Sequence, residues 1–446
     1  MDLTNLHLLS ASDAARLIRD GAITSEELVK ACLARIQEVD SQVCAWAFLD
    51  PEYALEQART ADQLRLSGNP IGPLHGVPVG VKDIFDTADM PTECGSVLWT
   101  GRMPSRDATT VALLRAAGAI VMGKTVTTEF AFFSPGKTRN PHNPEHTPGG
   151  SSSGSAAAVA AGMVPLALGT QTAGSVIRPA AFCGVIGFKP SHGVISRHGV
   201  LQLSRTLDHV GMFARSLDDI ALLAEQLVNH DENDPDTRPR ARIPFLETCR
   251  EEPPLAPMFG FIKTPYWDRV EAESKEGFSE LMEELGGQAE EVDLFPSAAN
   301  AWDWHQTILG AELAVSLARE WDKGRDKLSQ QLRAQIERGQ ELRAAEYLRA
   351  RTCVEPVHES FIELFEQRYD AIITPAAPGA APKGLASTGD PTFCSVWTLL
   401  GMPAISLPLM QSAGGLPIGV QLVGPRGGDA RLLRTARWLT AKMVAS

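Results

Sequence analysis

Two loops rich in glycine and serine lie on either side of one short apolar segment, and they constrain this chain more than any other feature. Residues 149–155 read GGSSSGS, and residues 169–175 read GTQTAGS. Small side chains take little room, and glycine adopts backbone conformations closed to other residues, so main-chain N–H groups in such loops can approach a substrate closely. An oxyanion hole requires such an approach.

The segment between the two loops argues against a flexible linker. Residues 156–162 are small helix formers, and residues 164–168 form an apolar run as long as a buried strand. A phosphate-binding loop is the next alternative, because Gly149 and Gly154 have the Walker spacing, but Ser155 stands where that motif requires lysine. A dinucleotide-binding Gly-x-Gly-x-x-Gly pattern is absent from both loops.

These residues resemble the amidase signature hydrolases, whose hallmark is a Gly-Gly-Ser-Ser segment followed by a Gly-Gly-Ser-Ile-Arg-type segment. Residues 73–83 (PLHGVPVGVKD) resemble the lysine motif of the family, and residues 179–190 continue the signature. Residues 401–408 and 415–424 resemble its closing strands, so the resemblance spans nearly the whole chain. It implies an α/β fold with a large mixed β-sheet sandwiched by helices.

The domain organisation follows from the same resemblance. Because the motif residues are dispersed from Lys82 to the C-terminal strands, we expect a single domain over residues 1–446. Its catalytic core is expected at residues 60–215. Residues 255–365 form a charged helical segment of the kind that varies in the family and often helps to wall the substrate pocket.

The resemblance also assigns the catalytic roles. Ser175 is the nucleophile, Ser151 is a bridging serine preceded by a cis peptide bond, and Lys82 is the terminal base. The chemistry agrees, because a serine hydroxyl needs a base to take its proton and a lysine can act as that base only when it is neutral. Burial lowers the pKa of a lysine. The alternating valines at 77–81 predict a strand with Lys82 on its other face, although a solvated strand edge stays open.

Around the nucleophile the sequence predicts an oxyanion hole and departs from the family pattern. The expected donors are the backbone N–H groups of Thr172, Ala173, Gly174 and Ser175. Gln171 stands where many family members have aspartate, Ala173 replaces the first glycine of the usual pair, and Arg178 comes one residue late.

Three residues are candidates for substrate binding: Gln171, Arg178 and Trp397. For Arg178 we favour a structural role, tying the loop to a carboxylate, over a fork for an anionic substrate group. Trp302, Trp304 and Trp397 are aromatic candidates for the pocket wall, although a large ring is more often core.

Two other kinds of site are disfavoured. Residues 150–154 match Gly-x-Ser-x-Gly, but a nucleophile elbow must follow a strand, and residues 144–148 indicate a loop. His142 and His146 are four residues apart, yet Pro144 between them argues against a shared helix face, so no zinc site is expected. The sequence therefore predicts neither a metal nor a cofactor.

Composition narrows the partners and the compartment. The chain has 41 Lys and Arg against 54 Asp and Glu, a net charge of −13 that tends to repel nucleic acid. Its seven cysteines are widely spread without a Cys-x-x-Cys pair, which indicates reduced thiols. No basic leader and no run of eighteen apolar residues occurs, so we expect a cytoplasmic protein without membrane contact, as a monomer or homodimer.

Local patterns predict parts of the scaffold. Residues 24–27 (TSEE) indicate a capping box, and a helix is expected to begin near Ser216. Ser152, Ser153 and Ser155 are expected to cap the Ala-rich helix. Residues 231–242, rich in Asp, Pro and Arg, indicate an exposed loop.

The function predicted from the sequence is hydrolysis of a C–N bond in a small amide or carbamate through a seryl acyl-enzyme, without cofactor. The alternative is the glutamine-hydrolysing subunit of a tRNA-dependent amidotransferase, which would need a partner subunit. A third hypothesis, a catalytically inactive scaffold, conflicts with the retention of Lys82, Ser151 and Ser175 in their motifs.

Overall fold

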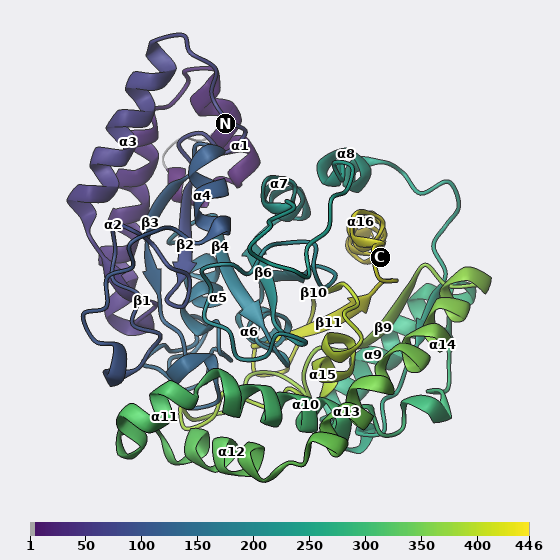
Figure 1. Cartoon of the computed structure of the whole chain (residues 1–446). Coiled ribbons are helices and arrows are strands. Elements are labelled where there is room, and N and C mark those ends of the chain that lie inside the picture. Colours follow the sequence, from purple (N-terminus) through teal and green to yellow (C-terminus); the bar gives the residue numbers. More distant parts are fainter. Residues whose placement is uncertain (1–4, 446) are drawn as a thin grey trace.

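The computed structural model describes residues 5–445, which build one mixed sheet of 11 strands (Figure 1). In sheet order the strands are β1 (Trp46–Leu49), β3 (Ile120–Thr125), β2 (Pro78–Lys82), β4 (Leu166–Gln171), β6 (His209–Ala214), β5 (Ile186–Lys189), β10 (Ala404–Gln411), β11 (Pro417–Val423), β9 (Ala371–Pro375), β7 (Phe259–Phe261) and β8 (Ala289–Glu291). β2 runs parallel to β3 and β4, whereas β4, β6, β5, β10 and β11 pair antiparallel.

Helices cover both faces of this sheet, which confirms the predicted α/β fold. They are α1 (Ala11–Arg19), α2 (Ser25–Val43), α3 (Pro51–Leu66), α4 (Thr109–Ala116), α5 (Ser153–Ala160), α6 (Ile177–Cys183), α7 (Leu217–Leu227), α8 (Phe245–Arg250), α9 (Ala272–Leu285), α10 (Ala301–Ser316), α11 (Ala318–Gly324), α12 (Gln330–Glu341), α13 (Ala344–Thr352), α14 (Val354–Gln367), α15 (Thr392–Leu399) and α16 (Asp429–Ala445). α5 and α6 pack against the central strands, and α16 and α7 pack against strands from another side. α10 joins α12, α13 and α15 in a separate layer at the bottom of Figure 1.

The predicted local signals place the expected elements. The Thr24 side chain accepts the N–H of Glu27 while the Glu27 carboxylate accepts the N–H of Thr24, so α2 begins at a complete capping box. Ser216 caps α7 by accepting the N–H of Asp219. The small residues after the first loop form α5, and the apolar run that follows leads into β4. The predicted capping box, the helix start near Ser216, the helix of small residues and the buried strand are thus confirmed.

The prediction that serines cap α5 is wrong. The Ser152 hydroxyl accepts the N–H of Thr170 and donates to its carbonyl, each at 3.2 Å. The Ser155 hydroxyl donates to the carbonyl of Leu168 at 2.7 Å, and that of Ser153 donates to Val126. These hydroxyls bind neighbouring backbone instead of the helix's own N–H groups. Ser152 and Ser155 hold α5 against β4, which leads into the second loop, and Ser153 holds it against the residue after β3.

The segment at 231–242 is a mostly exposed loop, as predicted, but a few of its residues are buried. Asp231 and Asp234 are buried, because each meets donors from the main body of the protein. Asp231 accepts hydrogen bonds from Ser196 at 2.6 Å and from Thr109 at 2.5 Å. Asp234 forms an ion pair with Arg197 at 2.7 Å. Hydroxyl donors around Asp231 and the positive charge of Arg197 beside Asp234, which composition does not reveal, explain why these two carboxylates lie inside.

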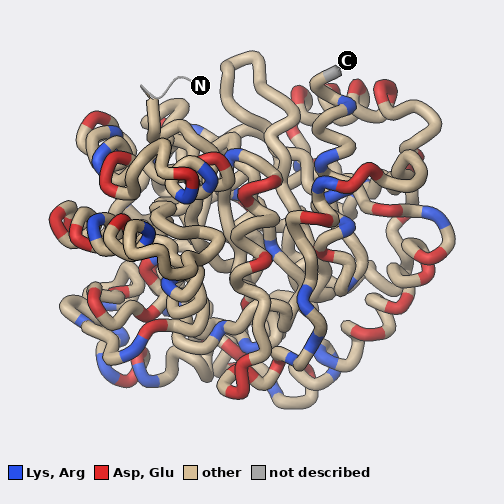
Figure 2. Tube along the Cα trace, turned by 90° about the horizontal axis from the view of Figure 1, so that it is seen from above, with Lys and Arg blue, Asp and Glu red and all other residues tan. Residues whose placement is uncertain are grey.

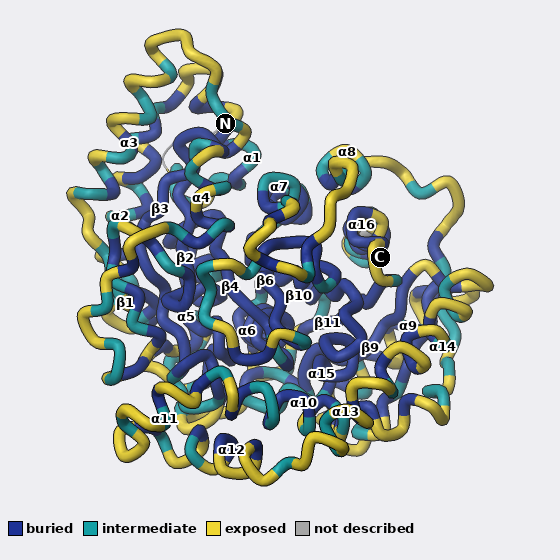
Figure 3. The backbone as a smooth tube through the Cα atoms, in the orientation of Figure 1, coloured by how far each residue is buried: buried dark blue, intermediate teal, exposed yellow. Residues whose placement is uncertain are grey.

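Burial and charge follow the layers. Figure 3 shows the central strands with α5, α6 and α15 buried and the outer helices exposed along one side. Figure 2 shows basic and acidic residues interleaved along the trace. All seven cysteines lie in the described part of the chain and are free thiols. Among the residues described, no helix combines the length and apolarity needed to cross a membrane.

Candidate active site

Lys82 lies at the end of β2, where every residue is buried, so the solvated-edge alternative does not apply. Its Nζ donates to Ser151 Oγ and to Thr170 Oγ1, both at 2.8 Å. Burial lowers the pKa of Lys82 to about 7, against the opposing effect of the Asp208 carboxylate. A lysine held in this way is substantially neutral near neutral pH and can accept a proton.

Ser151 and Ser175 come from the two loops that the sequence singled out. Ser151 is almost fully buried, and the peptide bond that precedes it is cis, as the family resemblance implied. Ser175 precedes α6 and is 9% exposed, so it is the more accessible of the two serines. The parallel pairing of β2 with β4 brings the end of the lysine strand beside the start of the second loop. The pairing thus places Lys82 beside the strand that leads to Ser175.

The loop after β4 leaves its backbone donors free. Within the described residues, no acceptor binds the backbone N–H groups of Thr172, Ala173, Gly174 or Ser175. Gly174 is closely surrounded, because an added Cβ would lie 3.1 Å from Pro391 Cβ and the neighbours would have to move by a few tenths of an ångström. Free N–H groups on consecutive residues beside a serine are the donors that an oxyanion hole needs.

Gln171 supports this loop from inside the protein. It is fully buried, and its amide oxygen accepts the N–H groups of Val176 at 2.9 Å and Ile177 at 3.0 Å. Its amide nitrogen donates to Thr398 Oγ1 at 3.0 Å. Because the protein engages the hydrogen-bonding groups of Gln171, this side chain supports the loop. Its contact with substrate is not tested by these hydrogen bonds and stays a prediction.

Arg178 is buried on α6 and connects the two serine loops. Its Nη2 donates to the carbonyl of Gly150 at 2.6 Å and to Thr388 Oγ1 at 3.1 Å. No carboxylate of the described residues pairs with it, so the proposed tie to a carboxylate is wrong and the tie runs to a backbone carbonyl. Burial lowers the pKa of Arg178 to about 10, which leaves the guanidinium charged at neutral pH.

The tryptophan candidates lie in packed surroundings. Trp397 is fully buried in α15, with its ring centroid 5.4 Å from that of Phe361. Trp302 Nε1 donates to the carbonyl of Thr392 at 2.8 Å, and its ring meets Tyr266 at 5.2 Å. Neither lines the cavities described below. The structure therefore places both rings in packing contacts.

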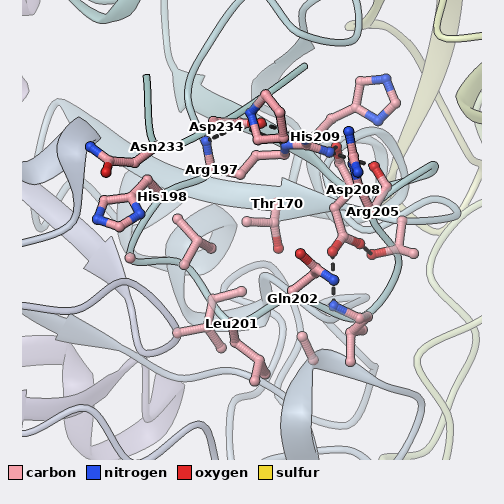
Figure 4. Close-up of a pocket in the computed structure, with 17 residues that line it drawn as sticks. Thr170, Arg197, His198, Leu201, Gln202, Arg205, Asp208, His209, Asn233 and Asp234 are labelled. Atoms are coloured by element: carbon pink, nitrogen blue, oxygen red, sulfur yellow. Dashed lines mark hydrogen bonds and ion pairs between the residues drawn. The ribbon is translucent and has the colours of Figure 1, made fainter. Parts of the chain in front are cut away.

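A cavity of about 370 Å³ opens beside β4 and the loop that follows it (Figure 4), although Lys82, Ser151 and Ser175 are not among its lining residues. Thr170, the partner of Lys82, and Thr172 of the loop both line it. Asp208 lines it too, accepting hydrogen bonds from Thr172 Oγ1 at 2.6 Å and from the N–H groups of Leu203 and Ser204. Burial raises the pKa of Asp208 to about 6, although these hydrogen bonds oppose the shift.

Sequence reasoning missed Thr170 and Asp208. Thr170 lies in the motif, but the direction of its hydroxyl depends on the pairing of β2 with β4. Asp208 follows the motif by more than thirty residues, in a segment with no chemical pattern of its own. A predicted parallel register could have found Thr170, whereas nothing local marks Asp208.

A larger cavity of about 1210 Å³ borders the first and shares Gln202, Arg205 and Pro235 with it. Residues of α10, α12, α13 and α14 form much of its wall. The helical segment at 255–365 therefore faces a cavity that borders the smaller one, while no residue of the two serine loops lines it. That this segment walls a substrate pocket stays a prediction. The wall of the larger cavity is the surface to which the prediction applies.

Histidines do not join the catalytic serines. Among the described residues no histidine hydrogen-bonds to Ser151 or Ser175. His142 Nε2 lies 2.9 Å from the carbonyl of Cys183, and His146 Nδ1 lies 2.7 Å from that of Ala381. Each of these two histidines thus contacts a backbone carbonyl. No cluster of metal-ligating side chains occurs in the described part of the chain.

Comparison with known families decides the class of the protein. The family model described as Amidase matches residues 27–433. The chain belongs to the amidase family. Its class is that of the amidase-family C–N hydrolases, which confirms the resemblance drawn from the sequence.

Curated relatives share the length of the chain. A glutamyl-tRNA(Gln) amidotransferase subunit of Symbiobacterium thermophilum is 36% identical, with 98% of this chain and 97% of that protein covered. The protein with the same name from Corynebacterium jeikeium is 33% identical, with 95% and 94% covered.

Solved structures share the fold. A chain from a vestigial protein complex that reveals the origins of an s-triazine catabolic enzyme has a TM-score of 0.90 and 27% identity, covering 97% of this chain and 98% of that one. A 6-aminohexanoate cyclic dimer hydrolase has a TM-score of 0.86 and 26% identity, with 99% of both covered. The peptide amidase of Stenotrophomonas maltophilia has a TM-score of 0.84 and 28% identity, with 98% and 97% covered.

Proposed function

We propose that this protein hydrolyses an amide C–N bond through an acyl-enzyme on Ser175, with Ser151 and Lys82 as the proton relay. The observation that carries the proposal is the 2.8 Å hydrogen bond between buried Lys82 Nζ and Ser151 Oγ. It joins a base of lowered pKa to a hydroxyl beside a loop of unoccupied N–H donors. Together these features supply a nucleophile, a base and an anion site.

The proposed reaction has two halves. Neutral Lys82 takes a proton from Ser151, which takes the proton of Ser175 as its oxygen attacks the substrate carbonyl carbon. The tetrahedral oxyanion is held by backbone N–H groups of the 172–175 loop, each such donor contributing roughly 3–4 kcal/mol of transition-state stabilisation. Ser151 then protonates the leaving nitrogen, since expulsion of an unprotonated amine is slow. Water cleaves the acyl ester by the same route.

The curated relatives favour glutamine as the substrate. Both relatives named above are amidotransferase subunits that match this chain over nearly its full length. On this proposal the protein liberates ammonia from glutamine and works with a partner subunit in a tRNA-dependent transamidation. The relatives thus support the alternative drawn from the sequence more strongly than the small-molecule hypothesis.

A free-standing hydrolase of small amides or carbamates is the second candidate. It is favoured by the fold similarity to a 6-aminohexanoate cyclic dimer hydrolase and a peptide amidase. It is also favoured by the departures beside the nucleophile, Gln171 and the late Arg178. A carbamate presents the same carbonyl flanked by nitrogen, so the same relay could cleave it.

One assay series separates these candidates. The purified protein is incubated with glutamine, simple primary amides, chromogenic anilides and aryl carbamates, and release of ammonia or amine is followed with Ser175→Ala as control. Ser175→Ala and Lys82→Ala should abolish turnover, and Ser151→Ala should leave a small remainder. Wild-type activity in any of the three variants would contradict the relay.

The substrate profile then assigns the role. Glutaminase activity that rises when a co-purifying partner is added supports the amidotransferase subunit. Turnover of anilides or carbamates by the isolated chain supports the free-standing hydrolase.

A further inference from the structure

Three consecutive peptide groups of the oxyanion loop are bound at their carbonyl oxygens. His305 Nε2 lies 2.9 Å from the carbonyl of Thr172, and Thr398 Oγ1 donates to that of Ala173 at 2.7 Å. The first turn of α6 supplies the third tie, because the Arg178 N–H donates to the carbonyl of Gly174 at 3.0 Å. The donors come from α10, α15 and α6, so three separate elements meet at this loop.

Binding the carbonyl of a peptide group also fixes the direction of its N–H. In a planar trans peptide the C=O and N–H bonds point in opposite directions. In the described chain the cis peptide bond is the one before Ser151, so the loop peptides are trans. The N–H groups of Ala173, Gly174 and Ser175 therefore point away from the elements that hold their carbonyls, and none meets an acceptor among the described residues.

We propose that His305 and Thr398 are positioning residues that aim the Ala173 and Gly174 N–H groups at the developing oxyanion. This inference rests on the proposed function of the loop. Both residues lie outside the signature core at 60–215, and the sequence predicts a catalytic role for neither. Their action is indirect, because each holds the carbonyl of the peptide group whose N–H faces the reacting oxygen.

The surroundings of His305 make it a donor. A carbonyl oxygen only accepts hydrogen bonds, so Nε2 carries the proton in this contact. His305 is fully buried, and its Nδ1 has no acceptor among the described residues. A second proton would place an uncompensated charge there, and burial lowers the pKa of His305 to about 4. The ring therefore remains neutral, with its proton on Nε2, throughout the neutral pH range.

Gln171 directs the hydroxyl of Thr398. The Gln171 amide nitrogen donates to Thr398 Oγ1 at 3.0 Å, which leaves the single hydroxyl proton for an acceptor. That proton has two nearby carbonyls, Ala173 at 2.7 Å and Cys394 at 3.1 Å, and the shorter contact is to the loop. An ionised aspartate in place of Gln171 could not donate to Thr398 and would accept its proton instead. The departure from the family pattern at this position thus supports the arrangement.

Matched substitutions test the proposal. Thr398→Val and His305→Leu remove the donors at similar volume, whereas Thr398→Ser and His305→Gln retain a donor. Thr307→Val is the control, because the Thr307 hydroxyl on the same helix donates only to the Asp303 carbonyl within α10. Each variant is compared for kcat, KM, melting temperature and inhibition by an aryl boronic acid, which forms a tetrahedral anionic adduct on a serine.

A misdirected oxyanion donor should act on the transition state alone. We expect Thr398→Val and His305→Leu to lower kcat about 10- to 100-fold and to weaken boronate inhibition in parallel, with KM within about threefold. The Ser and Gln variants should recover most of both losses. The Thr307 control should match the wild type.

Two results would overturn the proposal. One is retention of kcat within about twofold in both donor-less variants. The other is equal weakening of boronate and of a non-hydrolysed substrate amide, which indicates general damage to the site. If no amide is hydrolysed by the wild type, the proposed function fails, but Ser175-dependent boronate binding still measures the donors across the same variants.

Discussion

The pH dependence of turnover offers a direct test of Lys82 as the base. Its pKa is lowered to about 7 by burial, and only the neutral amine can accept the proton of Ser151. Below that pKa the neutral fraction falls tenfold per pH unit, so kcat/KM at pH 5 should be roughly a hundredfold below its plateau. The assay is kcat/KM for a turned-over amide from pH 5 to pH 9, with Ser175→Ala as background.

Asp208→Asn should shift the acid limb, which is the fall of kcat/KM on the low-pH side of the profile, to lower pH. The Asp208 carboxylate raises the pKa of Lys82, because a nearby anion stabilises the ammonium form. Removing the charge therefore lowers the pKa of Lys82, and the limb moves to lower pH. Asp208 has a pKa raised to about 6, so in the wild type the two groups titrate as a pair near neutrality.

The same substitution should lower the plateau. Asparagine has a single acceptor oxygen, so it cannot accept from Thr172 Oγ1 and from the N–H groups of Leu203 and Ser204 at once, as the two carboxylate oxygens do. The loop at 172–175 is then held less firmly, and this lowers kcat at every pH. A lower plateau combined with a limb at lower pH is the expected signature.

Asp234→Asn is the matched control. Asp234 lines the same cavity, but its partner is Arg197 and it is not among the groups that shift the pKa of Lys82. The acid limb of the kcat/KM profile of Asp234→Asn should keep the wild-type midpoint. A limb that moves to higher pH in Asp208→Asn, or that moves equally in both variants, would refute the assignment of Lys82 as the titrating base.

Three further substitutions have defined outcomes. Lys82→Met should abolish turnover yet raise the free energy of unfolding at pH 7 by about 2 kcal/mol. The substitution removes a destabilising contribution of about 4 kcal/mol, which comes from the lowered pKa of the buried lysine. It also removes two stabilising hydrogen bonds of about 1 kcal/mol each. Between pH 7 and 10.5 the lysine is protonated in the unfolded wild type but neutral in the folded one. The stability gained by Lys82→Met should therefore decrease as the pH rises through that interval, as thermal melts at several pH values would show. Arg178→Met should lower kcat about 10- to 100-fold through loss of its bond to the Gly150 carbonyl, and Arg178→Lys should restore part of it. Gly174→Ala should lower kcat with little change in KM, because its Cβ would lie 3.1 Å from Pro391 and shift the loop.

Local patterns made part of the fold and site predictable. The alternating valines before Lys82 and the small residues after the first loop correspond to β2 and α5, because strand and helix periodicity are properties of short segments. Ser151 and Ser175 could be singled out because the segments that contain them resemble the amidase signature. The capping prediction failed at Ser152, since a nearby strand offered its backbone as a partner.

Residues that act across the fold left no local signal. Thr170 reaches Lys82 only through the pairing of β4 with β2, and Asp208 reaches Thr172 from a later loop. The Arg197 and Asp234 pair lies inside because each charge compensates the other, whereas composition alone indicates exposure. Such residues depend on tertiary neighbours and become visible only when the strands and loops are assembled.

Burial by itself does not make a lysine a base, as two other buried lysines show. Lys124 and Lys189 are as fully buried as Lys82. Burial lowers the pKa of Lys124 too, against the opposing effect of the Asp83 carboxylate, which lies 3.4 Å from its Nζ. Burial lowers the pKa of Lys189 to about 7, the same value as for Lys82. The pKa therefore does not separate Lys189 from Lys82.

The hydrogen-bond partners separate them. Lys189 Nζ donates to the backbone carbonyls of Pro190 and Met402, which hold no proton to give. Lys82 Nζ contacts the hydroxyl of Ser151, which can pass a proton to it. Lys189→Met should therefore keep the acid limb of kcat/KM at its wild-type midpoint even if stability changes. A displaced limb in that variant would mean that Lys189 contributes to the ionisation controlling turnover, and the assignment to Lys82 would need revision.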